Sequence, residues 1–157
     1  MLLFCMMVCT AGYAKTVGFV CMYNSDAPTG AVDLTAALET ELFDLCFDRG
    51  IIATSGEYIT GNVERYKDNS SFIQRFDSPP DLVVALYCEY MQGPRRGSNS
   101  SEQAINWKKV QWKIIDFSVK FVRFEESINP ETLPESDLKQ KVKSIGKTIG
   151  AKILENL

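Results

Sequence analysis

The sequence contains no histidine. This absence excludes catalytic triads and dyads that depend on an imidazole base, zinc sites with histidine ligands, and pH switches based on histidine. Carboxylate chemistry is not excluded, because aspartate and glutamate together number 20, but no spacing singles out a catalytic pair among them. We therefore predict no catalytic residue and no metal site.

The sequence also lacks a Cys-x-x-Cys pair, which argues against a metal knuckle or a thioredoxin-like redox site. Three of the five cysteines, Cys21, Cys46 and Cys88, lie in apolar segments, where a thiol behaves as a small hydrophobic group. We expect these three to be buried, free thiols in the core. In an oxidising compartment one pair of them could instead form a disulfide bond, and the sequence leaves this alternative open.

Neither an excess of positive charge nor a phosphate-binding loop is present. The net charge is −3, which provides no bulk attraction to nucleic acid. The segment Gly146-Lys147-Thr148 resembles the end of a phosphate loop, but it lacks the earlier glycine and lies within a predicted helix. We therefore expect no cofactor and no nucleic-acid partner.

Residues 1–14 form an uncharged, apolar segment that ends in the small residues Gly12 and Ala14 on either side of a tyrosine. A helix needs about 20 apolar residues to cross a membrane, so this segment is too short to span one. Its length and small-residue ending are typical of a secretory signal peptide. We predict cleavage between Ala14 and Lys15, with Ala11 as the second choice, and export to the periplasm.

Other interpretations of this segment stay open. No lysine or arginine precedes the apolar run, which leaves open a start upstream of Met1. An uncleaved anchor, a buried first element, and a lipoprotein modified at Cys5 or Cys9 are further alternatives. Residues 15–157 have an ordinary length for one domain, and we predict a single domain over this range.

Apolar periodicity divides residues 15–157 into strands and helices. Strands 16–23 and 81–91 are nearly continuous apolar runs, as expected for central strands that are covered on both faces. Strands 105–116 and 119–127 alternate apolar and polar residues around a tight turn, which predicts a hairpin with one wetter face. The other elements are a helix at 31–49, a strand at 51–55, a short helix at 71–76 and a helix at 136–157.

The last predicted helix contains Gly146 and Gly150, each of which lowers helix propensity by about 1 kcal/mol relative to alanine. We expect them to let the helix sit close to a sheet. A membrane pairing motif is the alternative, and the five lysines of this helix disfavour it. The order of elements predicts an α/β (α+β) sandwich, with two long helices and one short helix packed on a mixed sheet of about five strands.

This order resembles the envelope-protein group that includes the amino-terminal domain of TolB, the curli-secretion lipoprotein CsgG and the penicillin-binding-protein activator LpoB. In this sequence and in that group, a first strand (here 17–23) leads to an amphipathic helix. A hairpin (here 111–124) then precedes a carboxy-terminal amphipathic helix. Ile114-Ile115-Asp116 matches the first half of the hairpin pattern in that group, whereas Phe117-Ser118 replaces its Thr-Gly turn. The resemblance implies a non-enzymatic envelope component that docks other proteins, and it assigns no role to any single residue.

Four basic residues, Arg95, Arg96, Lys108 and Lys113, lie on the loop 92–103 and on the hairpin, near two tryptophans. Basic residues among aromatic ones can bind nucleic acid or an anionic polymer. A solvated strand face with lysines along an edge produces the same pattern, and we favour this interpretation. We predict these four residues as the first place for a protein partner to dock.

The favoured function is that of an exported, non-enzymatic cell-envelope protein that acts in protein binding or assembly, either soluble or close to the membrane. The alternative is a small enzyme that uses carboxylates or a free cysteine. A further hypothesis is a homo-oligomer whose interface is an edge strand or the hairpin. The sequence does not identify the envelope partner.

Overall fold

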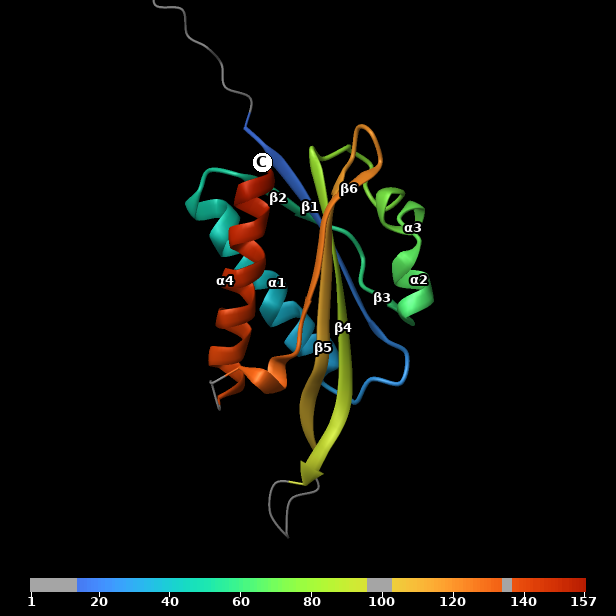
Figure 1. The fold of residues 1–157 in the computed structure, drawn as a ribbon, viewed down its shortest axis with the longest axis vertical. Coiled ribbons are helices and arrows are strands. Elements are labelled where there is room, and N and C mark those ends of the chain that lie inside the picture. Colours follow the sequence, from blue (N-terminus) through green and yellow to red (C-terminus); the bar gives the residue numbers. More distant parts are fainter. Residues whose placement is uncertain (1–13, 96–102, 134–136) are drawn as a thin grey trace, which may run out of the picture.

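The protein has three layers, in which a mixed sheet of six strands lies between two layers of helices (Figure 1). The structure is a computed structural model and describes residues 14–95, 103–133 and 137–157. Two long helices cover one face of the sheet, and two short helices lie on the other. This architecture confirms the predicted α/β sandwich, with one strand and one short helix more than expected.

Two parallel strands that are far apart in the sequence form the middle of the sheet. β1 (Thr16–Asn24) pairs along its length with β4 (Leu82–Arg95), and every residue of β1 from Val17 to Met22 is buried. β2 (Ile52–Ser55) and β3 (Ile59–Gly61) pair one after the other with the opposite side of β1, also in parallel. The nearly continuous apolar composition of β1 and β4 thus predicted their central position correctly.

The other half of the sheet is antiparallel. β5 (Gln103–Asp116) pairs with β4, and β6 (Phe121–Ile128) pairs with β5, which gives the strand order β2-β1-β4-β5-β6. The hairpin turn is longer than predicted, since it spans residues 117–120 and places Lys120 at a φ of 56°. The predicted loop at 92–103 is also shorter, because both strands extend into it, and residues 96–102 lie outside the described part.

The two helical layers differ in size. α1 (Ala31–Asp48) and α4 (Leu138–Asn156) lie side by side on one face of the sheet, and the 3₁₀ turn η1 (Pro130–Thr132) precedes α4. On the other face lie α2 (Val63–Lys67) and α3 (Ser70–Ile73), which together replace the single short helix predicted at 71–76. None of the described helices has the length and apolar character needed to cross a membrane.

The larger core lies between the sheet and the pair α1 and α4. It contains the alternate residues of the central strands that point to this face, such as Phe19, Leu86 and Trp112, together with Leu42 and Ile149 of the helices. Cys21, Cys46 and Cys88 are free and buried here, which confirms that these three thiols belong to the core and form no disulfide bond.

The two glycines of α4 face α1 rather than the sheet, which corrects the expected role of Gly146 and Gly150. A Cβ atom at Gly146 would lie 3.1 Å from Cβ of Glu41, and one at Gly150 would collide with the side chain of Leu45. Both contacts are on α1. The absence of side chains therefore allows close packing between the two long helices.

Candidate functional site: a hollow at one end of the sheet

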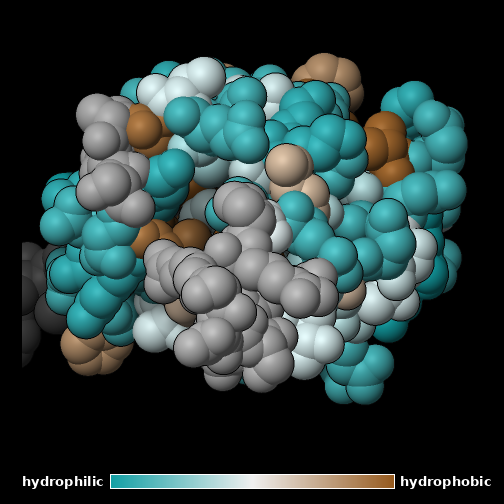
Figure 2. All heavy atoms as spheres, turned by 90° about the horizontal axis from the view of Figure 1, so that it is seen from below, coloured by the Kyte–Doolittle hydropathy of each residue, from teal (hydrophilic) through white to brown (hydrophobic). Residues whose placement is uncertain are grey.

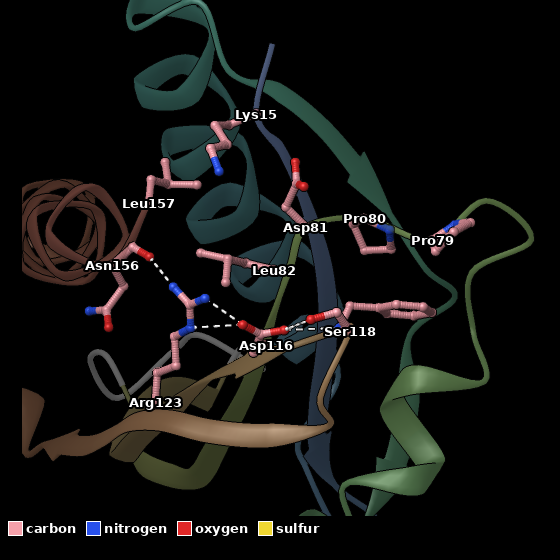
Figure 3. A pocket seen from close by; sticks show the side chains of 11 residues that line it. Lys15, Pro79, Pro80, Asp81, Leu82, Asp116, Ser118, Arg123, Asn156 and Leu157 are labelled. Atoms are coloured by element: carbon pink, nitrogen blue, oxygen red, sulfur yellow. Dashed lines mark hydrogen bonds and ion pairs between the residues drawn. The ribbon is translucent and has the colours of Figure 1, made fainter. Parts of the chain in front are cut away.

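A hollow of about 270 Å³ lies where β1 and β4 begin, β5 ends and α4 ends (Figure 3). Apolar residues, among them Pro80, Leu82 and Leu157, form part of its wall. The polar groups come from four segments that are far apart in the sequence. They are Lys15, Asp81, Asp116, Ser118, Arg123 and Asn156.

Asp116, the last residue of β5, organises one side of the hollow. Its Oδ1 atom accepts hydrogen bonds from the Ser118 hydroxyl at 2.6 Å, from the Ser118 N–H at 2.9 Å and from the Val119 N–H at 3.3 Å. Its Oδ2 atom accepts from Nε of Arg123 at 3.1 Å and forms an ion pair with the same guanidinium. The bonds from Ser118 and Arg123 hold the pKa of Asp116 well below its usual range, so this carboxyl stays ionised and is a poor proton donor.

Arg123 joins three elements at this end of the sheet. It lies in β6, beside the register shift between Ile114 and Ile115 on β5. Besides contacting Asp116, it donates through Nη1 to the carbonyl of Asn156 at 2.7 Å, in the last turn of α4. A cation at the carboxyl end of a helix also interacts favourably with the helix dipole. Arg123 therefore fastens α4 to the hairpin.

Asp81 performs a similar task on the other side of the hollow. Its Oδ2 atom accepts from the N–H of Thr16 at 2.8 Å and from the Thr16 hydroxyl at 2.9 Å. In return, Asp81 donates its own N–H to the hydroxyl oxygen of Thr16 at 2.9 Å. The bonds from Thr16 lower the pKa of Asp81. Both carboxylates of the hollow are thus engaged in holding strand ends together, which makes neither of them a good general acid or base.

The turn after Asp116 is rigid and displays apolar side chains. The three bonds to Asp116 Oδ1 fix its backbone at Ser118 and Val119, and Lys120 completes it in the left-handed region. The Val119 side chain is 68% exposed, and the Phe121 side chain is 66% exposed. The sequence predicted a tight turn here but did not mark it as a candidate site. The run Asp116-Phe117-Ser118 carried a further signal, because aspartate before serine favours a side-chain-capped turn.

Of the four basic residues predicted to meet a partner, the structure describes the side chains of Lys108 and Lys113, which lie in different surroundings. Lys108 is exposed and forms an ion pair with Glu89 at 2.6 Å. Arg95 ends β4, and its side chain, like the whole of Arg96, lies outside the described part of the chain. A partner-binding role for Arg95, Arg96 and Lys108 stays a prediction.

Lys113 is buried, which corrects the expectation that it lies on a solvated strand face. Its side chain is covered by α2 and α3, and the residue is only 2% exposed. Its ammonium donates to the carbonyl of Tyr66 at 2.5 Å and lies 4.5 Å from the ring centre of Tyr66 and 4.9 Å from that of Phe72. Lys113 therefore lies against a second, smaller apolar core between the sheet and the α2–α3 segment, which includes Tyr66 and Phe72, and its charge is not presented to solvent.

The three thiols that the structure describes, Cys21, Cys46 and Cys88, offer no activated nucleophile. Burial raises the pKa of Cys46 to about 11 and that of Cys88 to about 12, and burial next to Glu39 raises that of Cys21 as well. A thiol with a raised pKa has little of the reactive thiolate at neutral pH. In the described ranges, no group of three or more cysteines and acidic residues is arranged to hold a metal ion.

Several solved structures share this fold. A putative neuraminyllactose-binding hemagglutinin homolog from Helicobacter pylori aligns with a TM-score of 0.51 and 11% identity, over 89% of this chain and 86% of that one. Lipoprotein GNA1162 from Neisseria meningitidis aligns at 0.47 and 12% identity, over 87% of this chain and 99% of that one. TolB from Acinetobacter baumannii aligns at 0.45 and 16% identity, over 90% of this chain but 28% of that one.

Identities this low establish a similarity of fold and nothing finer. Structures of a TolB and of a bacterial lipoprotein, to which the predicted resemblance points, align with this chain at TM-scores below 0.5. The CsgG and LpoB parts of that resemblance stay a prediction. No curated protein matches the sequence. A family model with the description "Uncharacterised protein" matches residues 16–157, and the chain therefore belongs to that family.

Proposed function

We propose that this protein is an exported, non-enzymatic component of a bacterial cell envelope that binds a partner protein through the β5–β6 turn. The observation that carries the proposal is the turn at residues 117–120, whose backbone is hydrogen-bonded to Asp116 and which exposes the side chains of Val119 and, at the start of β6, Phe121. Large apolar side chains on a preorganised backbone bind with a small loss of conformational entropy.

The surroundings of the turn support a binding role over a catalytic one. The two carboxylates nearest to it, Asp81 and Asp116, are ionised and hydrogen-bonded to structural partners. Viewed from the opposite end of the molecule, the surface is mainly hydrophilic, and its hydrophobic residues form small, separate groups (Figure 2). Val119 and Phe121 are among the most exposed large apolar side chains of the described residues, which makes them a candidate contact surface.

The position of the predicted cleavage site supports export. The first backbone bonds of the sheet involve Lys15, whose carbonyl accepts from Ile52 at 2.9 Å, and Thr16, whose carbonyl accepts from Asp81 at 3.0 Å. Cleavage after Ala14 would therefore leave every described strand pair intact.

The fold is also similar to that of the Helicobacter pylori protein, which is described as a homolog of a binding protein, although this similarity transfers no ligand.

Cell fractionation and amino-terminal sequencing test the export half of the proposal. The expected result is a mature protein in the periplasmic fraction that begins at Lys15 or, failing that, at Gly12. Recovery from the cytosol with Met1 still in place would refute export.

Photo-crosslinking in cells tests the binding half. A photoreactive amino acid replacing Phe121 should give a defined adduct with one envelope protein, and Val119→Ser should reduce its yield severalfold. Val32 provides a matched control, since it is an exposed valine (42%) on α1, away from the turn. Val32→Ser should leave the adduct unchanged, and equal losses from both substitutions would contradict a role for the turn.

A further inference from the structure

β2 forms one edge of the sheet, and its outer backbone groups are open. Among the described strands it pairs with β1 alone, and the N–H of Ile52 donates to the carbonyl of Lys15 at 2.9 Å. Because backbone groups alternate between the two sides of a strand, the N–H and C=O groups of Ala53 and Ser55 point away from β1. Such an edge can accept another strand.

Apolar side chains are exposed along the same edge. Phe47, in the last turn of α1, is 83% exposed, and Ile52 is 52% exposed. They border a groove of about 340 Å³ that runs between the end of α1 and β2. Its lining consists of Phe43, Phe47, Gly50, Ile51, Ile52 and Ala53. Soluble proteins usually protect an edge with charged residues or proline, and residues 50–56 contain neither.

We propose that this edge pairs with β2 of a second copy of the chain, as antiparallel strands around a two-fold axis. In the register that satisfies the open groups, Ala53 of each copy lies opposite Ser55 of the other and exchanges both backbone hydrogen bonds with it. Phe47 of each copy then covers the edge strand of the other. The six-stranded sheet becomes continuous through the dimer, and the contact uses the same patch on both chains.

The distribution of charge favours a second copy as the occupant. The uncharged run 50–56 is preceded by Arg49 and followed by Glu57. Antiparallel pairing brings Arg49 of one copy and Glu57 of the other to the same end of the strand pair, two residues out of direct opposition, so unlike charges lie near each other at both ends; Glu57 also contacts Arg75 at 3.7 Å. The opposite edge differs, because Glu125 and Glu126 lie exposed within β6 itself and protect that edge by their charge. The dimer is independent of the partner proposed above, which uses the β6 side of the sheet.

Engineered cross-linking tests the register. When Ala53 faces Ser55 of the second copy, the two Thr54 residues face each other across the axis as a non-hydrogen-bonded pair. Their Cα atoms would be about 4.5 Å apart, a separation that a disulfide bond can span. Thr54→Cys should therefore form a covalent dimer under mild oxidation. The unsubstituted protein and Thr60→Cys, an exposed residue of β3 on the same edge, should not.

Light scattering of the full chain tests the dimer itself, with an expected mass twice that of one chain. Phe47→Ser removes the main apolar contact, and Ala53→Pro removes an outward N–H without touching a bond to β1. Both substitutions should shift the mass to that of a monomer, while Val32→Ser should not. A wild-type protein that stays monomeric, a dimer that persists in both variants, or equal cross-linking at residues 54 and 60 would each overturn the proposal. Thermal unfolding of the two variants would show whether their folds are intact.

Discussion

The two faces of the sheet are built on different principles. One face is covered by α1 and α4, helices of 18 and 19 residues, and its core is formed by apolar side chains and buried thiols. The other face is covered by α2 and α3, helices of five and four residues, over a smaller apolar core in which the ammonium of Lys113 is also buried.

This difference indicates how stability is distributed. A long apolar interface gains free energy in proportion to the area it removes from water, whereas helices of one turn gain little by themselves. The smaller layer packs on a second, smaller core of apolar side chains that includes Tyr66, Phe72 and Ile73, and Lys113 adds its contacts with Tyr66 and Phe72. We expect the α2–α3 segment to open before the α1–α4 layer does.

The largest expected effect on the free energy of unfolding comes from truncating one buried isoleucine on each face, in two separate variants. Ile149 of α4 is fully buried, and Ile73 of α3 is 9% exposed. Replacing a buried isoleucine by alanine costs about 2–5 kcal/mol of stability, and we expect Ile149→Ala near the top of this range and Ile73→Ala near its lower end. Denaturant unfolding of both variants measures the difference. Equal losses would mean that the smaller layer is packed as tightly as the larger one.

A pair of substitutions at Lys113 separates packing from charge on the smaller face. Lys113→Ala removes the stem of the side chain as well as the donor to the Tyr66 carbonyl, and should cost about 2–4 kcal/mol. Lys113→Met keeps the stem and removes a charge that is expensive to bury, so we expect a change within about 1 kcal/mol. If methionine is as harmful as alanine, the ammonium itself holds α2 in place.

The sequence predicted the larger face well, because regular periodicity reports long elements. The leucines of α1 and the apolar stripe of α4 recur at helical spacing, and the runs in β1 and β4 lack polar residues. The role of the two glycines in α4 was predicted wrongly. Gly146 and Gly150 signal that something approaches closely, but only the tertiary arrangement shows that it is α1 and not the sheet.

The smaller face was harder to predict, because short elements carry little periodicity. Lys113 alternates with apolar neighbours on β5, and this pattern normally marks a wet face. The cover for that face comes from residues 63–73, whose two helices are too short to show a pattern. The hollow escaped prediction for a related reason. Asp81, Asp116 and Arg123 are unremarkable in sequence, and the sheet topology alone brings them together.

The smallest expected effect is a dependence of stability on pH that arises from Lys113 on the smaller face. Burial lowers the pKa of the Lys113 ammonium, although the carboxylates of Glu125 and Asp68 act in the opposite direction. The folded protein therefore releases this proton at a lower pH than the unfolded chain, in which lysine titrates near about 10.4. Where the unfolded state binds more protons, stability rises with pH. The wild type should therefore gain stability relative to Lys113→Met as the pH is raised from neutral towards that value. Denaturant unfolding of both proteins across this range measures the difference, in which contributions common to the two proteins cancel. A difference that stays constant, or that moves against the wild type, would show that burial does not disfavour the charged form of Lys113.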